Sequence, residues 1–361
     1  MPTTPRLCVT VTASTMAALR ARRDEVADAD LVELRLDTVR DPDVAGALQG
    51  RRQPVLVTCR ARWEGGAFAG SEDERRRLLE EALSRGADYV DVEWQAGFDD
   101  LLAKTAGRRI VVSHHDFAGV PADFTDRLRA MRGTGAEVVK IAVQVPNLAS
   151  CLPLLEAGRA QRDGEQTVLL GMGRAGFATR TLAAHFGSCW TYAGNESALG
   201  QAPLAEMLRE YRFRAITSST AIYGLVGAPL VHSVSPAMHN AAIAVAGLDA
   251  VYVPFEAADA EDFLTFARAL DVQGASVTIP FKRDLLAAIE EPDEVARNTG
   301  AVNTLKRSGA TWQGTNTDIE GFLAPLGGRS LRGARVAILG AGGAARAVAA
   351  ALAGTGAQVS V

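Results

Sequence analysis

Lysine is scarce in this chain. Of its 361 residues 38 are basic, and only four of these are Lys. Only an amine forms an imine with a ketone, and only an amine readily becomes neutral and nucleophilic when it is buried. Each Lys of this Arg-rich chain is therefore a candidate for chemistry that Arg cannot perform, although a solvated surface Lys is the ordinary alternative. The four are Lys104, Lys140, Lys282 and Lys306.

Lys140 lies inside the apolar run 138–143, so its amine should emerge from a buried strand into the interior of the fold. Burial and nearby cations such as Arg60 would both favour the neutral, nucleophilic amine. The alternative is a buried Lys that is neutralised by Glu33 or Glu93. Because so few Lys are present in the chain, we favour the nucleophile.

Two adjacent histidines, His114 and His115, fall near the end of the run 109–117 that precedes this Lys. A His on the strand next to an imine-forming Lys is well placed to move protons at the carbon beside the imine. We assign this role to His115, and Glu64 could fix its tautomer. A lone His is more often a satisfied core residue, and one of these two neighbours should point away from the site.

The second half of the chain holds a different set of polar residues. Lys282 follows a strand-like run, and Asp318 is its candidate partner. A Lys and an Asp that share one substrate hydroxyl form a reasonable acid/base pair for hydride transfer. Ser233 and Ser235 precede a helix start at Pro236, where both hydroxyls can reach one carboxylate. Helix capping is the ordinary explanation of such a Ser pair.

The last motif is a glycine turn. The apolar run 335–339 leads into Gly340-x-Gly342-x-x-Ala345 and then into an Ala-rich stretch. A strand that enters such a turn and continues as a helix brings backbone N–H groups close to a dinucleotide pyrophosphate. Tight strand-helix turns without a ligand also use Gly.

Regular elements must position these residues. Short β-branched runs alternate with helical stretches, such as 71–85 and 123–132, through the first 195 residues. Eight such units fit a (β/α)8 TIM barrel, in which chemistry occurs where strands end. The rival, a doubly wound sheet, lacks a Gly-rich turn after its first strand. The predicted strands are 7–13, 31–37, 54–60, 89–94, 109–117, 137–143, 167–173 and 189–193.

Composition places the chain among globular proteins. It is 48% hydrophobic and 22% charged with a net charge of −4, which excludes a disordered or fibrous protein and gives no general preference for nucleic acid. No run of about 20 apolar residues predicts a membrane span. The four Cys show no metal-binding or disulfide spacing, so we expect no metal and a cytoplasmic location.

The residues 5–212 resemble the type I 3-dehydroquinate dehydratases. The motifs that carry this resemblance are Glu33-Leu34-Arg35-Leu36-Asp37, Arg60 before Glu64-Gly65-Gly66, Ser113-x-His115-Asp116-Phe117, Val139-Lys140-Ile141-Ala142, Met172-Gly173 with Arg180, and Ser197-x-x-x-Gln201. The order and number of these motifs are very specific. One departure is Tyr192, where Phe is usual in the family.

This resemblance implies that Lys140 forms a Schiff base with the substrate ketone, that His115 moves the adjacent proton to the leaving hydroxyl, and that Glu64 orients His115. It also implies that Arg180 holds the substrate carboxylate and that this site needs no cofactor. The remaining implied substrate-binding residues are Glu33, Arg35, Arg60, Met172, Ser197 and Gln201.

The residues 221–361 resemble the shikimate dehydrogenases. The resemblance implies a catalytic pair, Lys282 and Asp318, with shikimate bound near them and NADP(H) bound at the glycine turn. The implied shikimate-binding residues are Ser233, Ser235, Asn303, Asp318 and Thr278. The implied cofactor-binding residues are Gly340, Gly342, Gly343, Ala344 and Ala345.

Together the halves predict a bifunctional enzyme in the plant-like order, with domains at 1–215, 220–330 and 331–361. The first site would convert 3-dehydroquinate to 3-dehydroshikimate, and the second would reduce that product to shikimate. Two alternatives are a quinate/shikimate dehydrogenase and a non-catalytic quinate-sensing regulator. Because the chain stops in the second strand of the predicted Rossmann domain, we expect a C-terminally truncated protein. A homodimer is compatible with the sequence.

Overall fold

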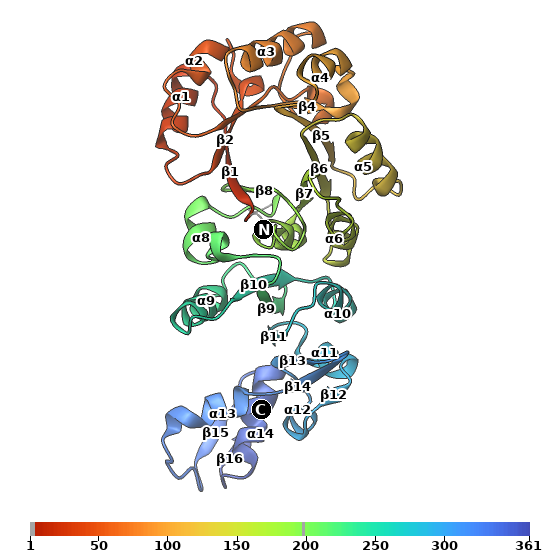
Figure 1. Cartoon of the computed structure of the whole chain (residues 1–361). Coiled ribbons are helices and arrows are strands. Elements are labelled where there is room, and N and C mark those ends of the chain that lie inside the picture. The colour runs from red at the N-terminus through yellow and green to blue at the C-terminus, as the bar shows by residue number, and fades with distance from the viewer. Residues whose placement is uncertain (1–3, 197–198) are drawn as a thin grey trace. The chain divides into compact units, whose positions relative to one another are not determined.

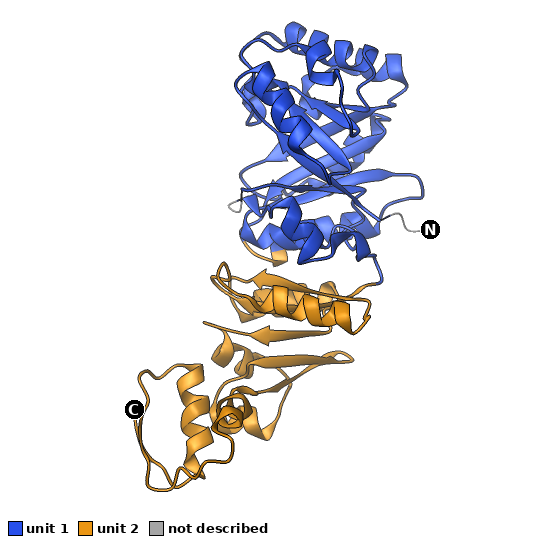
Figure 2. Cartoon of the chain, turned by 90° about the vertical axis from the view of Figure 1, so that its left-hand side faces the viewer, with its two compact units in different colours: residues 1–146, 150–219 blue, residues 147–149, 220–361 orange. Residues whose placement is uncertain are grey.

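The computed structural model describes residues 4–196 and 199–361. The chain divides into two compact units (Figure 2). Unit 1 consists of Met1–Pro146 and Ser150–Ser219, and unit 2 consists of Asn147–Ala149 and Thr220–Val361.

Unit 1 is a ring of eight parallel strands in the order β7-β6-β5-β4-β3-β2-β1-β8 (Figure 1). An isolated bridge between Thr167 and Ser188 links the two ends of this order, so the barrel is nearly closed. The strands are β1 (Arg6–Val11), β2 (Leu31–Arg35), β3 (Val55–Thr58), β4 (Tyr89–Glu93), β5 (Ile110–Asp116), β6 (Val138–Gln144), β7 (Gln166–Met172) and β8 (Trp190–Ala193). The predicted TIM barrel is confirmed, and each strand coincides with its predicted run.

Helices surround the ring because strands buried on both faces need an outer cover. Both helical stretches predicted above are present, and Ser71 caps the first of them through a reciprocal bond with Glu74. The helices are α1 (Met16–Glu25), α2 (Val44–Leu48), α3 (Glu72–Ser84), α4 (Asp99–Thr105), α5 (Phe124–Gly133), α6 (Leu152–Arg159), α7 (Phe177–Thr181) and α8 (Leu204–Arg209). Short 3-10 turns follow several strands at their carboxyl ends, among them η2 (Arg62–Glu64) after β3 and η3 (Trp94–Ala96) after β4.

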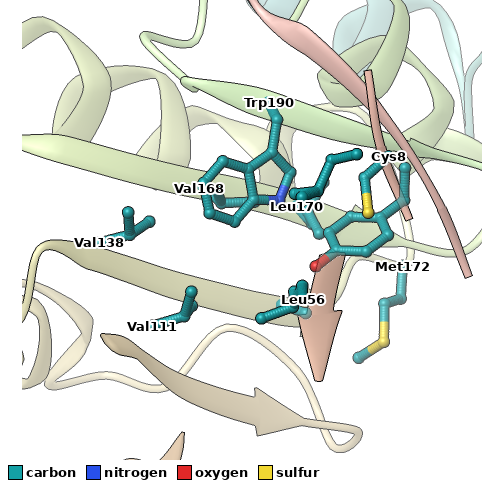
Figure 3. Close-up of a cluster of buried hydrophobic side chains, with 11 residues drawn as sticks. Cys8, Leu56, Val111, Val138, Val168, Leu170, Met172 and Trp190 are labelled. Atoms are coloured by element: carbon teal, nitrogen blue, oxygen red, sulfur yellow. The ribbon is translucent and has the colours of Figure 1, made fainter. Parts of the chain in front are cut away.

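An apolar cluster fills part of the barrel interior (Figure 3). Its side chains come from strands around the whole ring, so they identify the face of each strand that points into the barrel. Because residues two positions apart on a strand share a face, the polar residues two positions further along each strand also point inward. Met172, a predicted substrate contact, belongs to this cluster. Other members are Cys8, Leu56, Val111, Val138, Val168, Leu170 and Trp190.

Unit 2 contains a six-stranded mixed sheet in the order β10-β9-β11-β13-β14-β12. Its strands are β9 (Ala221–Gly227), β10 (Ala250–Glu256), β11 (Gly274–Val277), β12 (Glu291–Pro292), β13 (Thr304–Ser308) and β14 (Thr311–Thr315). The accompanying helices are α9 (Ser235–Val245), α10 (Ala260–Ala269), α11 (Lys282–Ala288), α12 (Glu294–Thr299) and α13 (Asp318–Leu323). An α/β unit after the barrel was predicted.

The end of the chain forms a separate β-α-β element. The strands β15 (Arg335–Ala337) and β16 (Gln358–Ser360) pair in parallel, and α14 (Gly343–Ala353) connects them. No helix within residues 4–196 and 199–361 has the length and apolar character needed to cross a membrane.

Candidate active sites

Lys140 on β6 is buried inside the barrel, with 5% of its side chain exposed. Its Nζ lies 3.2 Å from Asp91 Oδ2 and 3.8 Å from Glu33 Oε1. The charges nearest to the amine are therefore carboxylates, one of which is the Glu33 of the alternative above, and Arg60 contacts Asp91, the closer of the two. Glu93, the other carboxylate considered above, instead pairs with Arg75 of α3.

Asp91 on β4 is the closest partner of that amine, and the sequence analysis missed it. Ser113 Oγ donates a hydrogen bond to Asp91 Oδ1 at 2.5 Å, and Arg60 Nη2 lies 2.9 Å from the same oxygen. Burial alone would raise the pKa of Asp91, but the charges of Arg60 and Lys140 outweigh it and hold the pKa well below its usual range. A charged residue at an inward position of the apolar run 89–93 was the signal that could have identified it.

His115 and Glu64 form a second pair at the end of β5. His115 Nδ1 lies 3.2 Å from Glu64 Oε2, and the backbone N–H of His115 donates to Glu64 Oε1 at 3.3 Å. Burial, followed by the charge of Arg60, lowers the pKa of His115 to about 4. The ring is thus neutral near pH 7, and because Glu64 can only accept at Nδ1, the unprotonated nitrogen is Nε2.

His114 also lies beside Glu64, with Nδ1 3.4 Å from Oε1. The His114 ring faces α5, where Arg127 contacts its Nε2, so His115 and not His114 belongs to the inward face of β5, although Glu64 reaches both rings. Glu64 follows β3 in the turn η2, so its carboxylate reaches β5 from another element and offers one oxygen to each ring.

Three arginines of the predicted site differ in whether a carboxylate of the protein pairs with them. Arg60 contacts three buried carboxylates at 2.9–3.2 Å, and both Arg35 Nε and Nη2 donate to Asp37 at 2.9 Å. Arg180 on α7 is buried, but among the described residues it has no carboxylate partner, and its Nη2 donates to the carbonyl of Leu199 at 3.0 Å. Burial lowers the pKa of Arg180 to about 10, which leaves it a cation near pH 7.

Glu33 on β2 accepts hydrogen bonds from two hydroxyls that sequence analysis missed, Thr10 Oγ1 at 2.7 Å and Thr58 Oγ1 at 2.6 Å. Gln201 lies next to the end of β8, since a Cβ atom at Gly194 would be 2.1 Å from Gln201 Oε1. The predicted residue Ser197 lies outside the described residues.

Tyr192, the departure from the resembled family, faces the amine of the site. Lys140 Nζ lies 4.7 Å from the centre of the Tyr192 ring. The Tyr192 hydroxyl is buried and has no hydrogen-bond partner among the residues that the structure describes. The ring therefore contributes a cation–π contact that Phe would also provide, and the extra hydroxyl makes no hydrogen bond to any of the described residues.

In unit 2, Lys282 at the start of α11 and Asp318 at the start of α13 are joined by an ion pair, with Nζ 2.5 Å from Oδ2. Asn303 Nδ2 donates to the other oxygen, Asp318 Oδ1, at 2.7 Å and to Thr317 Oγ1 at 2.9 Å. The antiparallel strands β11, β13 and β14 bring these segments together. Three of the predicted dehydrogenase residues thus form one cluster.

The Ser pair lies in the loop that precedes α9. Ser233 Oγ accepts a hydrogen bond from the backbone N–H of Ser235 at 3.2 Å, but the N-cap of α9 is Val234 and no side chain caps the helix. The start of this loop is fixed beside the end of β11, because the N–H of Ala228 donates to the carbonyl of Ile279 at 3.1 Å. Thr278 precedes Ile279, so the loop and the Thr lie near the strand end that leads to Lys282.

The glycine turn has an open form. Gly340 has φ +116°, a conformation that L side chains rarely adopt. The first turn of α14 has neither a side-chain cap nor an acidic residue, so its N–H groups remain available to an anion. A Cβ atom at Gly343 would lie 3.0 Å from the Lys282 side chain. The turn thus adjoins the Lys282 cluster and fits a dinucleotide phosphate group.

Two family models match the chain. The model of type I 3-dehydroquinase matches residues 7–218. The model of the shikimate dehydrogenase substrate binding domain matches residues 225–305.

Two known relatives match different lengths of this chain. The bifunctional 3-dehydroquinate dehydratase/shikimate dehydrogenase, chloroplastic, of Arabidopsis thaliana is 33% identical over 89% of this chain and 58% of its own length. A shikimate dehydrogenase (NADP(+)) of Nostoc sp. is 49% identical over 37% of this chain and 48% of its own length. The chain therefore spans about half the length of these relatives.

Among solved structures, the type I 3-dehydroquinate dehydratase from Clostridium difficile is similar to this chain with a TM-score of 0.51 and 26% identity. The match covers 56% of this chain and 89% of that protein.

Proposed function

The chain belongs to the type I 3-dehydroquinase family, and we propose that its barrel dehydrates 3-dehydroquinate to 3-dehydroshikimate. The observation that best supports this is a buried amine, Lys140, on the strand next to a neutral imidazole, His115. In the register of β5 and β6, Ser113 pairs with Lys140 and His115 pairs with Ala142. Both functional side chains thus belong to one inward face, two positions apart.

The reaction proceeds through an imine. Lys140 Nζ, after loss of its ammonium proton, adds to the substrate ketone carbon, and loss of the ketone oxygen as water leaves a protonated imine. His115 Nε2 then takes a proton from the adjacent carbon, because the imine accepts the electron pair. That pair returns to form the double bond and expels the hydroxyl group, which leaves as water with the proton from His115. Hydrolysis regenerates the amine, so the net change is loss of one water.

The charged groups around the amine suit this sequence. Asp91 and Glu33 face Nζ and can balance the positive charge of the protonated imine. Arg180 is a buried cation without a carboxylate partner among the described residues, which is what a site for the substrate carboxylate requires. We propose that Arg35, Arg60, Met172 and Gln201 line the rest of the site.

We further propose that unit 2 binds shikimate and 3-dehydroshikimate and interconverts them. Lys282 and Asp318 would share the reacting hydroxyl and move its proton, while Asn303 orients the Asp318 carboxylate and Ser233, Ser235 and Thr278 bind the rest of the substrate. Gly340, Gly342, Gly343, Ala344 and Ala345 would hold NADP(H). When it is bound, NADP(H) supplies or accepts the hydride. The alternatives, a quinate/shikimate dehydrogenase and a quinate-sensing regulator, are not favoured by the family matches.

The dehydratase proposal is tested by mixing the chain with 3-dehydroquinate and following the ultraviolet absorbance of the conjugated product. Borohydride added during turnover should reduce the imine, and peptide mass spectrometry should locate the adduct on Lys140. Turnover without any adduct would contradict the imine route.

The pH dependence of this activity should reflect His115. The base must be unprotonated, so kcat/KM should fall as the pH drops through about 4, the pKa of the buried ring. A free His would lose activity near pH 6.5 instead. Rates measured from pH 3.5 to 8, with return to pH 7 as the control for reversible folding, distinguish the two. A fall centred near 6.5 would show that His115 is not held in this state.

The ligand of unit 2 can be tested by calorimetric titration with shikimate. Asn303→Ala should weaken shikimate binding about 10-fold, because it removes one hydrogen bond to the ligand and frees the Asp318 carboxylate. Lys306→Ala, an exposed change on β13, is the matched control. Equal affinities for the parental chain and the Asn303 variant would remove Asn303 from the site.

A further inference from the structure

A buried histidine that the catalytic scheme above does not use lies beside Glu64. Resting on the proposed dehydratase function, we propose that His114 is a positioning residue that fixes the Glu64 carboxylate and thereby the tautomer of His115. His114 is 6% exposed, and its ring lies between Glu64 on one side and Arg127 of α5 on the other.

Arg127 determines the tautomer of His114. Arg127 Nη1 lies 3.1 Å from His114 Nε2. A guanidinium can only donate, so Nε2 must accept and carries no proton. The proton of the neutral imidazole is therefore on Nδ1, the atom that lies 3.4 Å from Glu64 Oε1. His114 thus turns its Nδ1–H toward the carboxylate at this distance, although this nitrogen makes no hydrogen bond to any of the described residues.

Neighbouring groups fix this arrangement. Arg127 Nε donates to Asp123 Oδ1 at 2.8 Å, and Arg127 Nη1 lies 3.8 Å from Asp116 Oδ2. The ring of Trp94 in η3 meets the His114 ring edge-on, with centres 6.1 Å apart and an interplanar angle of 80°. The His114 ring is thus bounded by η2, η3 and α5, and cannot turn without breaking one of these contacts.

Glu64 needs this fourth contact because its two oxygens have different tasks. Oε2 lies 3.2 Å from His115 Nδ1 and 2.9 Å from Arg60 Nη1. Oε1 faces His114 and the backbone N–H of His115. With His114 present, its Nδ1–H faces Oε1 in addition to the backbone N–H of His115, and this favours the orientation that keeps Oε2 toward His115. Without it, Oε1 keeps only the backbone contact, and the carboxylate is freer to rotate.

The charge of Glu64 depends on the same contacts. Burial alone would raise the pKa of Glu64, but hydrogen bonding by His114 and His115 and the charge of Arg60 lower it to about 2. Loss of the His114 donor makes Glu64 more basic, so Glu64 would stabilise protonated His115 more strongly. The acidic limb of the rate profile should therefore move to higher pH when His114 cannot donate.

Three substitutions of His114 test its contact with Glu64 and its contact with Arg127 separately. The amide nitrogen of His114→Asn can occupy the place of Nδ1 and donate to Glu64. The amide oxygen of His114→Gln reaches the place of Nε2 and can accept from Arg127, and His114→Leu keeps the bulk without any polar group. We expect His114→Asn to stay within about 3-fold of the parental kcat, and the Gln and Leu variants to lose about 10-fold in kcat with little change in KM. Their acidic limb should shift upward.

The matched control is Arg129→Leu, a change of an exposed arginine on the same helix, α5. It should leave the rate and the pH profile unchanged. If His114→Leu keeps the parental kcat and acidic limb, His114 has no positioning role. If His114→Asn loses as much as His114→Leu, the donor to Glu64 is not the essential feature, and the proposal is overturned.

A measurement without substrate keeps the inference separate from the proposed function. In the ¹⁵N-histidine-labelled chain, NMR couplings of the ring nitrogens should show His114 as the neutral Nδ1–H tautomer at pH 7, with His114→Asn identifying its signals. A neutral Nε2–H ring or an imidazolium would overturn the inference even if the chain dehydrates 3-dehydroquinate. If the chain does not dehydrate that substrate, the proposed function fails while the NMR result still decides the tautomer.

Discussion

Lys140→Ala should abolish dehydration of 3-dehydroquinate, with a loss in kcat on the order of 10⁴-fold or more, as for removal of the nucleophile of other covalent enzymes. Without the amine no imine forms, so the electron pair released by proton removal has no acceptor of comparable strength. The same variant should give no adduct with substrate and borohydride. Steady-state rates and intact mass measure the two effects.

Lys104→Ala is the control for this change. Lys104 on α4 is 59% exposed at its side chain and pairs with Glu80 on the surface, so its loss should affect neither rate nor adduct. Lys140→Ala also leaves Asp91 without its closest ammonium, and circular dichroism must show that the barrel still folds. A folded Lys140→Ala chain that turns over at the parental rate would end the imine proposal.

The barrel itself could be predicted from the sequence because it rests on repeated local signals. The runs 89–94 and 137–143 correspond to β4 and β6, and their polar residues project inward as alternation requires. The identity of the partners could not be predicted in the same way. Whether Asp91 or Glu93 faces Lys140 depends on strand tilt and on Arg75, which reaches Glu93 from α3.

The pair of histidines shows the limit of alternation. Adjacent residues on a strand point to opposite faces, which predicts that one of His114 and His115 leaves the site. The rule holds for the strand, but Glu64 comes from a turn after β3 and contacts both rings at the end of β5. The alternation of residues along a strand does not predict contacts that a loop makes with it, so the contact of Glu64 with both histidines could be found only in the folded structure.

In unit 2, the ordered motifs predicted which residues would act together, and the fold brings part of that set into contact. Lys282 and Asp318 are 36 residues apart and meet at 2.5 Å. Their separation is bridged by the antiparallel strands β13 and β14, whose register depends on a tight turn and not on Lys282 or Asp318. Helix capping, the ordinary explanation of the Ser pair, does not apply, because Ser233 Oγ bonds the N–H of Ser235 and no side chain caps α9.

His115→Ala should separate formation of the imine from the chemistry that follows. The amine of Lys140 is retained, together with its contacts to Asp91 and Glu33, so the ketone can still be captured. Removal of the general base and acid should lower kcat about 10²- to 10⁴-fold. Borohydride should therefore trap an adduct on Lys140 that has the mass of the reduced substrate imine, whereas the parental chain should also yield the adduct of the dehydrated product.

Mass spectrometry of the trapped protein distinguishes the two adducts, because they differ by one water. His239→Ala, a change on α9 in unit 2, is the matched control and should give the parental adduct pattern. If His115→Ala yields mainly the product adduct at the parental rate, another group removes the proton, and His115 is not the base. If it yields no adduct while it remains folded, His115 acts already in formation of the imine, and the order of steps proposed here must change.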